Sequence, residues 1–112
     1  MEELMRQVDG YCERTDFTYW AEPLNALTNL AFIAAGILMW GRVRGRGMPL
    51  AEVLCAILLA IGVGSFLFHT HATIWGALAD VLPIGLYILT YLFAVHCTFC
   101  SMSRLRAIAA TA

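Results

Sequence analysis

Three long runs of apolar residues dominate the pattern of hydrophobic and polar positions along the chain. They extend over about residues 23–40, 50–68 and 75–100, and short polar stretches separate them. A helix of roughly 20 apolar residues is long enough to cross the hydrocarbon core of a bilayer. Helix is the expected state, because lipid offers the backbone amides no other partner. The pattern therefore predicts an all-α integral membrane protein with three transmembrane helices in a single membrane domain, residues 1–112.

The composition supports a membrane location and excludes one class of partner. Of the 112 residues, 61% are apolar and 13% are charged, whereas soluble domains are typically about 45–50% apolar and about 25% charged. The formal net charge of −1 excludes a general electrostatic partnership with nucleic acid. Membrane lipid is the expected surrounding.

The basic residues indicate how the spans are oriented. All seven basic side chains are arginines, and five of them follow the first or the third apolar run, at Arg42, Arg44, Arg46, Arg104 and Arg106. The positive-inside rule places these two stretches on the cytoplasmic side. We therefore expect a multi-pass protein with a cytoplasmic C-terminus and an acidic extracytoplasmic segment, residues 1–22.

Strongly polar residues interrupt the outer half of each predicted span. They are Glu22, Asn25 and Asn29 in the first, Ser65 and His69 one helical turn apart in the second, and Asp80 in the third. Polar groups are costly within a bilayer and are functional candidates by default. A serine, an imidazole and a carboxylate at one depth predict a metal site or an acid–base site.

A purely structural interpretation competes with this one. Asn, Ser and His also hold membrane helices together through hydrogen bonds, and this is the commoner role for Asn25, Asn29 and Ser65 taken singly. For His69, an interfacial position explains the residue equally well. Asp80 fits the structural interpretation least, because a carboxylate in lipid is costly unless it is paired or has a function. The small residues Ala60 and Gly64 permit a close approach of helices.

The acidic residues of the N-terminal segment allow two interpretations. Asp9, Glu13, Asp16 and Glu22 supply the oxygen ligands that Ca²⁺ prefers. Their spacing does not match the calcium loop of an EF-hand, and a solvated acidic segment is the more common explanation.

Several short motifs, in order, resemble the alkaline ceramidase family. The chain carries YCER at residues 11–14, WAEPLN at 20–25, TNL at 28–30, GSFLFH at 64–69 and DVLP at 80–83. The resemblance covers about residues 9–93. It implies an N-terminal portion with the first three helices of a seven-helix bundle. It also implies an activity, the hydrolysis of the N-acyl amide bond of a ceramide-like membrane lipid.

The resemblance further implies two metals and a set of residue roles. In the family, zinc is held by three histidines, and His69 would be one of them. Ser65 would steady the oxyanion, and Asp80 would orient or deprotonate the attacking water. Glu13 and Glu22 would bind calcium. The family's further aspartate is replaced by Gly10, so Asp9 is a candidate third calcium ligand.

One departure from the family concerns the other two zinc ligands. The family supplies them as an H-x-x-x-H pair in its last span, and this sequence has no such pair. His71 would point nearly opposite to His69 on a continuous helix, and His96 would lie about 24 Å deeper than Asp80. Since a catalytic zinc needs three protein ligands, we expect a truncated form that is inactive alone.

Three hypotheses remain open from the sequence. The first is the ceramidase-type zinc amidase just described. The second is a non-catalytic membrane protein, or a half of a hydrolase whose missing helices come from a second chain. The third is another member of the same superfamily that acts on a different lipid, and the acids Glu13 and Glu22 favour the ceramidase branch over it.

Overall fold

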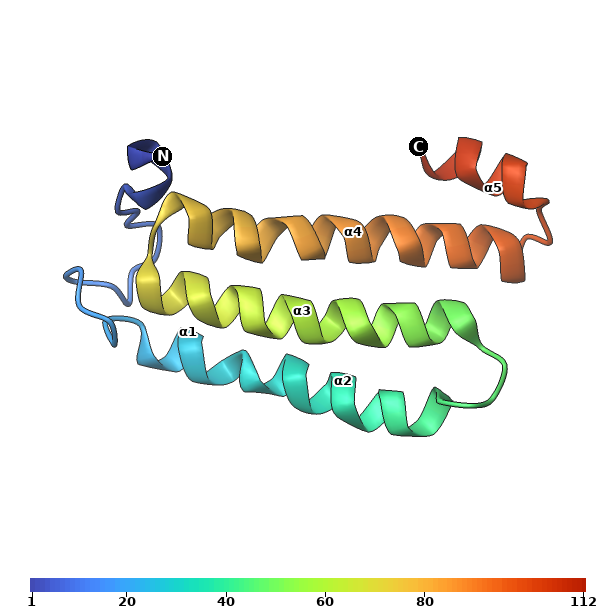
Figure 1. Cartoon of the computed structure of the whole chain (residues 1–112), viewed down its shortest axis with the longest axis horizontal. Coiled ribbons are helices and arrows are strands. Elements are labelled where there is room, and N and C mark those ends of the chain that lie inside the picture. Colours follow the sequence, from blue (N-terminus) through green and yellow to red (C-terminus); the bar gives the residue numbers. More distant parts are fainter.

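The structure, a computed structural model, describes all residues from Met1 to Ala112 and is built from helices (Figure 1). Its helices are η1 (Glu2–Met5), α1 (Pro23–Thr28), α2 (Leu30–Val43), α3 (Pro49–His71), α4 (Ile74–Thr98) and α5 (Arg104–Thr111). Gln7 and Thr73 form an isolated bridge, and there is no strand. The predicted all-α class is confirmed.

The long helices lie side by side in a row, with α3 between α2 and α4 (Figure 1). The chain reverses before α3 through Gly45 and Gly47, whose φ angles of 74° and 70° glycine adopts without steric penalty. It reverses again after α3 at Ala72, which has a φ of 48° and donates its amide to the carbonyl oxygen of Phe68. Successive long helices are therefore antiparallel.

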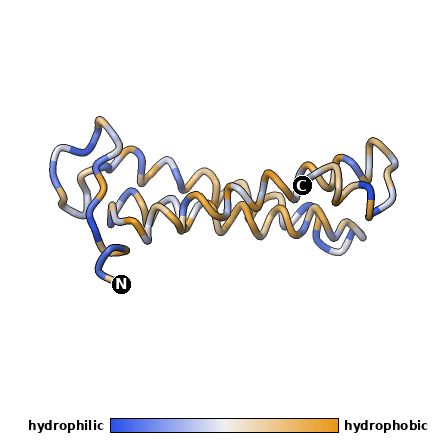
Figure 2. Tube along the Cα trace, turned by 90° about the horizontal axis from the view of Figure 1, so that it is seen from above, coloured by the Kyte–Doolittle hydropathy of each residue, from blue (hydrophilic) through white to orange (hydrophobic).

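Three helical segments are long and apolar enough to cross a membrane: Pro23–Val43, Pro49–His71 and Ile74–Thr98. The observed ends differ from the predicted ones by three residues or fewer, and the third segment stops at Thr98 rather than at residue 100. Figure 2 shows mainly apolar residues along the middle of the row and hydrophilic residues gathered at its two ends. This distribution is the one that a bilayer requires.

The first segment is interrupted, which its apolar run did not predict. α1 ends at Thr28 and α2 begins at Leu30, with Asn29 between them. The side-chain amide of Asn29 donates to the carbonyl oxygen of Asn25 at 2.7 Å. Local bonds of this kind compete with the regular backbone ladder. The two asparagines therefore stabilise the junction between α1 and α2.

Glycines on α3 allow its neighbours to approach closely. A Cβ atom on Gly64 would lie 1.9 Å from the carbonyl oxygen of Ala79 in α4, and one on Gly62 would lie 2.5 Å from the side chain of Ile33 in α2. Of the predicted small-residue pair, Gly64 makes the close approach and Ala60 is exposed. The approach at Gly64 brings Ser65 and Asp80 to the same crossing of α3 and α4.

The N-terminal segment covers the end of the row where α3 ends and α4 begins. The amide of Val8 donates to the carbonyl oxygen of Ala72 at 2.6 Å, and the amide of Ile74 donates to that of Arg6 at 3.1 Å. These bonds tie the segment to the α3–α4 turn. At the opposite end, α5 folds back beside α4 (Figure 1).

Candidate active site

Buried polar side chains concentrate where the N-terminal segment meets the helices. The buried polar residues are Arg14, Glu22, Asn29, Ser65, His69, Thr70, Thr73 and Asp80. Four of them are site residues that the sequence predicted: Glu22, Ser65, His69 and Asp80. The structure thus places three of the predicted catalytic and zinc-site residues, Ser65, His69 and Asp80, on the facing helices α3 and α4.

Glu22 is the link between the N-terminal segment and α3. Pro23 occupies the first turn of α1, where its fixed φ and missing amide hydrogen are tolerated, so Glu22 stands just outside the helix. Its Oε1 atom lies 2.9 Å from Nδ1 of His69, and its Oε2 atom accepts a hydrogen bond from Nε of Arg14. Only 3% of the Glu22 side chain is exposed. One buried carboxylate therefore holds a cation and an imidazole together.

His69 lies in the last turn of α3 with only one of its ring nitrogens occupied. Nδ1 pairs with Glu22, and the ring of Tyr11 packs edge-on against the imidazole with a centroid separation of 4.7 Å. The other nitrogen, Nε2, makes no hydrogen bond. A carboxylate bound to one ring nitrogen fixes the tautomer and orientation of a histidine that binds a metal through the other. His69 therefore has the setting of a metal ligand.

Asp80 carries the one buried side-chain oxygen that lacks a partner. Its Oδ1 atom is inaccessible to solvent and makes no hydrogen bond, and the residue is 8% exposed. Leaving a buried acceptor unpaired is costly. Ser65, on the facing helix, is also buried, and its hydroxyl makes no side-chain hydrogen bond. A donor and an acceptor are thus both available for a bound group.

The N-terminal acids do not converge on a common point. Both carboxylate oxygens of Glu13 accept hydrogen bonds at the start of α1, from the amide of Leu24 at 2.6 Å, the amide of Asn25 at 3.0 Å and the side-chain amide of Asn25 at 2.7 Å. Glu22 is engaged by His69 and Arg14, and Asp9 is exposed and makes no side-chain hydrogen bond. Each of the three predicted calcium ligands has different surroundings.

Asp16 forms a small exposed turn with Thr18. The Thr18 hydroxyl and amide both donate to Oδ1 of Asp16, at 2.5 and 2.9 Å. Together with the nearby Arg14 guanidinium, these hydrogen bonds hold the pKa of Asp16 below its ordinary value, because they favour the ionised form. Asp16 is therefore engaged within its own turn and does not contact the other acids.

The candidate residues fit a zinc site in part, and they do not fit a calcium site. No group of three or more His, Cys, Asp or Glu side chains in the chain is arranged to hold a metal ion. The free Nε2 of His69 and the unpartnered oxygen of Asp80 are groups suited to a zinc site, so they fit as part of one. The observed contacts of Glu13, Glu22 and Asp9 do not form a calcium site.

The other two histidines lie apart from His69. The ring of His71 packs against Tyr19 and Trp75, with Nδ1 within 3.2 Å of the carbonyl oxygen of Leu67. His96 lies near the far end of α4, where its Nδ1 pairs with the hydroxyl of Thr111 at 3.1 Å. Neither imidazole joins the candidate site.

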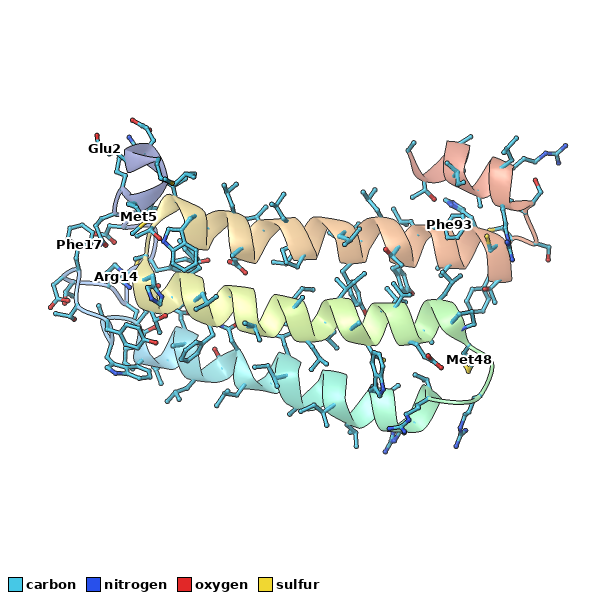
Figure 3. The ribbon with its side chains drawn as sticks, viewed as in Figure 1. Glu2, Met5, Arg14, Phe17, Met48 and Phe93 are labelled. Carbon is cyan, nitrogen blue, oxygen red and sulfur yellow. The ribbon has the colours of Figure 1, made fainter.

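Sequence reasoning missed Arg14. The side chain is 1% exposed, and it donates to Glu22 and to the carbonyl oxygen of His69 at the end of α3. Figure 3 shows Arg14 at this end of the helix row. The available signal was its place as the one basic residue among residues 9–22, which hold the acids Asp9, Glu13, Asp16 and Glu22. A glutamate at a membrane boundary needs a counter-charge, and Arg14 is the cation within reach along the chain.

Comparison with known proteins gives one match. A protein-family model described as Ceramidase matches residues 8–112. No curated protein and no solved structure matches the sequence.

Proposed function

Because this chain belongs to the ceramidase family, we propose that it forms the serine–histidine–aspartate part of a zinc-dependent amidase active site within the membrane. The family implies hydrolysis of amide bonds in general. The proposed substrate is a ceramide-type lipid, whose N-acyl bond is cleaved to a fatty acid and an amine.

The observation that carries the proposal is the buried Glu22–His69 pair beside the crossing of α3 and α4. Glu22 occupies Nδ1 of His69 at 2.9 Å, which leaves Nε2 free to bind a metal. The unpartnered Oδ1 of Asp80 supplies a carboxylate at the same crossing. Such a combination suits metal-assisted hydrolysis better than a purely structural role, because structural polar groups satisfy one another.

Zinc, when bound, lowers the pKa of a water molecule and polarises the amide carbonyl. His69 would hold it through Nε2. His71 and His96 lie elsewhere, so the remaining ligands come from residues other than these three histidines. The family resemblance makes an H-x-x-x-H pair on a further helix the proposed source, either in the same polypeptide or in a second chain.

Asp80 and Ser65 have the other two proposed roles in hydrolysis. Asp80 accepts the proton of the attacking water at Oδ1, which is poised for this because nothing else bonds to it. The hydroxyl of Ser65 donates a hydrogen bond to the oxyanion that develops on the amide carbonyl. The substrate reaches them from the bilayer, in which the outer faces of α2 and α4 lie.

The test uses residues 1–112 in three forms: alone, fused to the remaining helices of a complete ceramidase, and co-expressed with those helices as a separate chain. We expect no hydrolysis of a fluorescent ceramide by the first form and zinc-dependent hydrolysis by the fusion. Activity of the co-expressed form would identify a partner-dependent half. Zinc-dependent hydrolysis by residues 1–112 alone would refute the assignment of an incomplete site.

Variants in the active fusion test the residue roles. Asp80→Asn should lower kcat by about 10²–10⁴-fold, and Ser65→Ala should lower it by about 10²–10³-fold. His69→Gln should remove bound zinc, measured by metal analysis. Glu3→Gln, in the exposed helix η1, is the matched control and should hydrolyse normally. Unchanged turnover in the Asp80 and His69 variants would refute the proposed roles.

A further inference from the structure

Four oxygen atoms accept hydrogen bonds from Arg14. Its Nε donates to Oε2 of Glu22. Its Nη1 donates to the carbonyl oxygens of Asp16 and Thr18, at 3.0 and 3.2 Å, and its Nη2 donates to that of His69 at 3.1 Å. One carboxylate and three backbone carbonyls therefore surround a side chain that is 1% exposed. Each of the three guanidinium nitrogens therefore has an oxygen partner, and four of the five N–H donors are used.

Carboxylate and carbonyl oxygens are also the ligands that calcium takes in proteins. Here a guanidinium fills the space that they enclose, and its positive charge opposes the entry of a divalent cation at the same point. Glu13 does not compensate, because its two oxygens already cap α1. The oxygen atoms around Arg14 thus already have a cation, and Glu22 is the anion that pairs with it.

We propose that Arg14 is a built-in cation that takes the place of a bound calcium ion in ordering the N-terminal segment. The guanidinium joins the Asp16–Thr18 turn, the start of α1 and the end of α3 at one point. It also holds Glu22 against Nδ1 of His69. The folded segment is consequently independent of calcium, and Arg14 orients His69 through Glu22.

The first experiment measures calcium dependence on the purified chain in detergent micelles. The thermal midpoint and the hydrogen exchange of residues 9–22 are compared in millimolar CaCl₂, in MgCl₂ and in EGTA. We expect the same midpoint and the same exchange in all three. A midpoint that rises with CaCl₂ and falls with EGTA would overturn the proposal.

The second experiment removes the cation. Arg14→Gln leaves Glu22 as a lone buried charge, so the midpoint should fall and exchange within residues 9–22 should quicken by at least about tenfold. CaCl₂ should partly restore the midpoint of this variant, because its oxygen ligands are then free. Arg6→Gln removes an exposed arginine from the same segment and is the matched control. An Arg14→Gln variant that behaves like Arg6→Gln would contradict the proposal.

A double-mutant cycle separates the ion pair from a general loss of packing. Glu22→Gln leaves Arg14 as the lone charge, whereas the double variant Arg14→Gln/Glu22→Gln leaves none. The double variant should therefore lose less stability than the sum of the two single losses. Strict additivity would refute the pairing.

If Arg14→Gln does not accumulate, Arg14→Lys keeps the charge with fewer donors and should show an intermediate midpoint, unaffected by CaCl₂. Restoration of that midpoint by CaCl₂ would contradict the proposal. These readouts are independent of hydrolysis, so they distinguish this proposal from the proposed function.

Discussion

Three acidic side chains near the N-terminal end of the helix row have different hydrogen-bond partners. Glu13 accepts hydrogen bonds from the start of α1, and Glu22 contacts both Arg14 and His69. The Oδ1 atom of Asp80 has no partner. The side chains are therefore not interchangeable, although all three are acids in one region. Substitutions at them should give separable effects.

Glu13→Ala should destabilise the start of α1. The carboxylate accepts hydrogen bonds from two backbone amides that have no partner within the helix. Losing such a cap costs about 0.5–2 kcal/mol, which chemical denaturation in micelles would measure. Glu13→Gln retains one acceptor oxygen and should lose less. Equal stability of Glu13→Ala and the control Glu3→Gln would show that the contacts contribute nothing.

Low pH should open the turn formed by Asp16 and Thr18. Since the pKa of Asp16 is lowered in the folded chain, mainly by the Thr18 hydroxyl, ionised Asp16 stabilises the turn. That contribution is fully present above the ordinary pKa of an aspartate and is lost as pH falls through the lowered value. NMR spectra of the Thr18 amide against pH would follow this transition.

Thr18→Ala removes the hydroxyl donor and should raise the pKa of Asp16 toward its ordinary value. The comparison variant is Thr28→Ala, whose hydroxyl bonds to Asn25 instead. A titration of Asp16 that is the same in all three proteins would mean that the hydroxyl does not set its pKa.

The pairing of α3 with α4 depends on close backbone contact rather than on large interlocking side chains. At Gly64 the two helices approach so closely that a Cβ atom has no room, and at Gly76 a Cβ would lie 3.2 Å from the Cα of Phe68. Small residues of this kind drive helix association in lipid, where apolar burial supplies little net force. The crossing also fixes the position of Ser65 relative to Asp80.

Gly64→Ala should separate α3 from α4. The added Cβ would meet backbone, the Ala79 carbonyl oxygen, at 1.9 Å, and backbone cannot move aside as a flexible side chain can. Overpacking typically costs about 1–3 kcal/mol, which denaturation in micelles would measure. Gly85→Ala in α4 is the matched control, because nothing lies within 4 Å of its Cβ position. There alanine should be neutral or stabilising. Equal effects at the two sites would contradict the close crossing.

The distribution of charge along the helix row gives the protein two unlike ends. The acidic N-terminal segment covers the end where α3 meets α4, whereas the arginines of the α2–α3 loop and of the C-terminal region belong to the other end (Figure 1). Three crossings predict that the two ends lie on opposite sides of the bilayer. The positive-inside rule predicts that the arginine-rich end is cytoplasmic.

Cysteine labelling would test this orientation. Cys12 and Cys100 are both exposed and lie at opposite ends of the protein. In intact cells, a membrane-impermeant maleimide should label a variant that retains only Cys12. A variant that retains only Cys100 should react only after permeabilisation. Labelling of both variants in intact cells would contradict an odd number of crossings, and labelling of Cys100 alone would reverse the orientation.

The sequence by itself determined the helical class and the membrane location, because both follow from the length and composition of local apolar runs. It also marked Ser65, His69 and Asp80 as candidates, because polar residues stand out within such runs. Their proposed chemical roles remain predictions. The interruption at Asn29 and the helix α5 were not predicted, because each depends on local hydrogen bonds and packing that an apolar pattern does not encode.

Only the tertiary structure decided which polar groups are partners. Glu22 meets His69 across 47 positions of sequence, and Arg14 reaches the carbonyl of His69 across 55. Spacing along a chain carries no information about such contacts, because they depend on how α3 turns into α4 and on where the N-terminal segment crosses that turn. For the same reason, acids that suggested a shared calcium site have three separate environments, and an arginine between them supplies the positive charge.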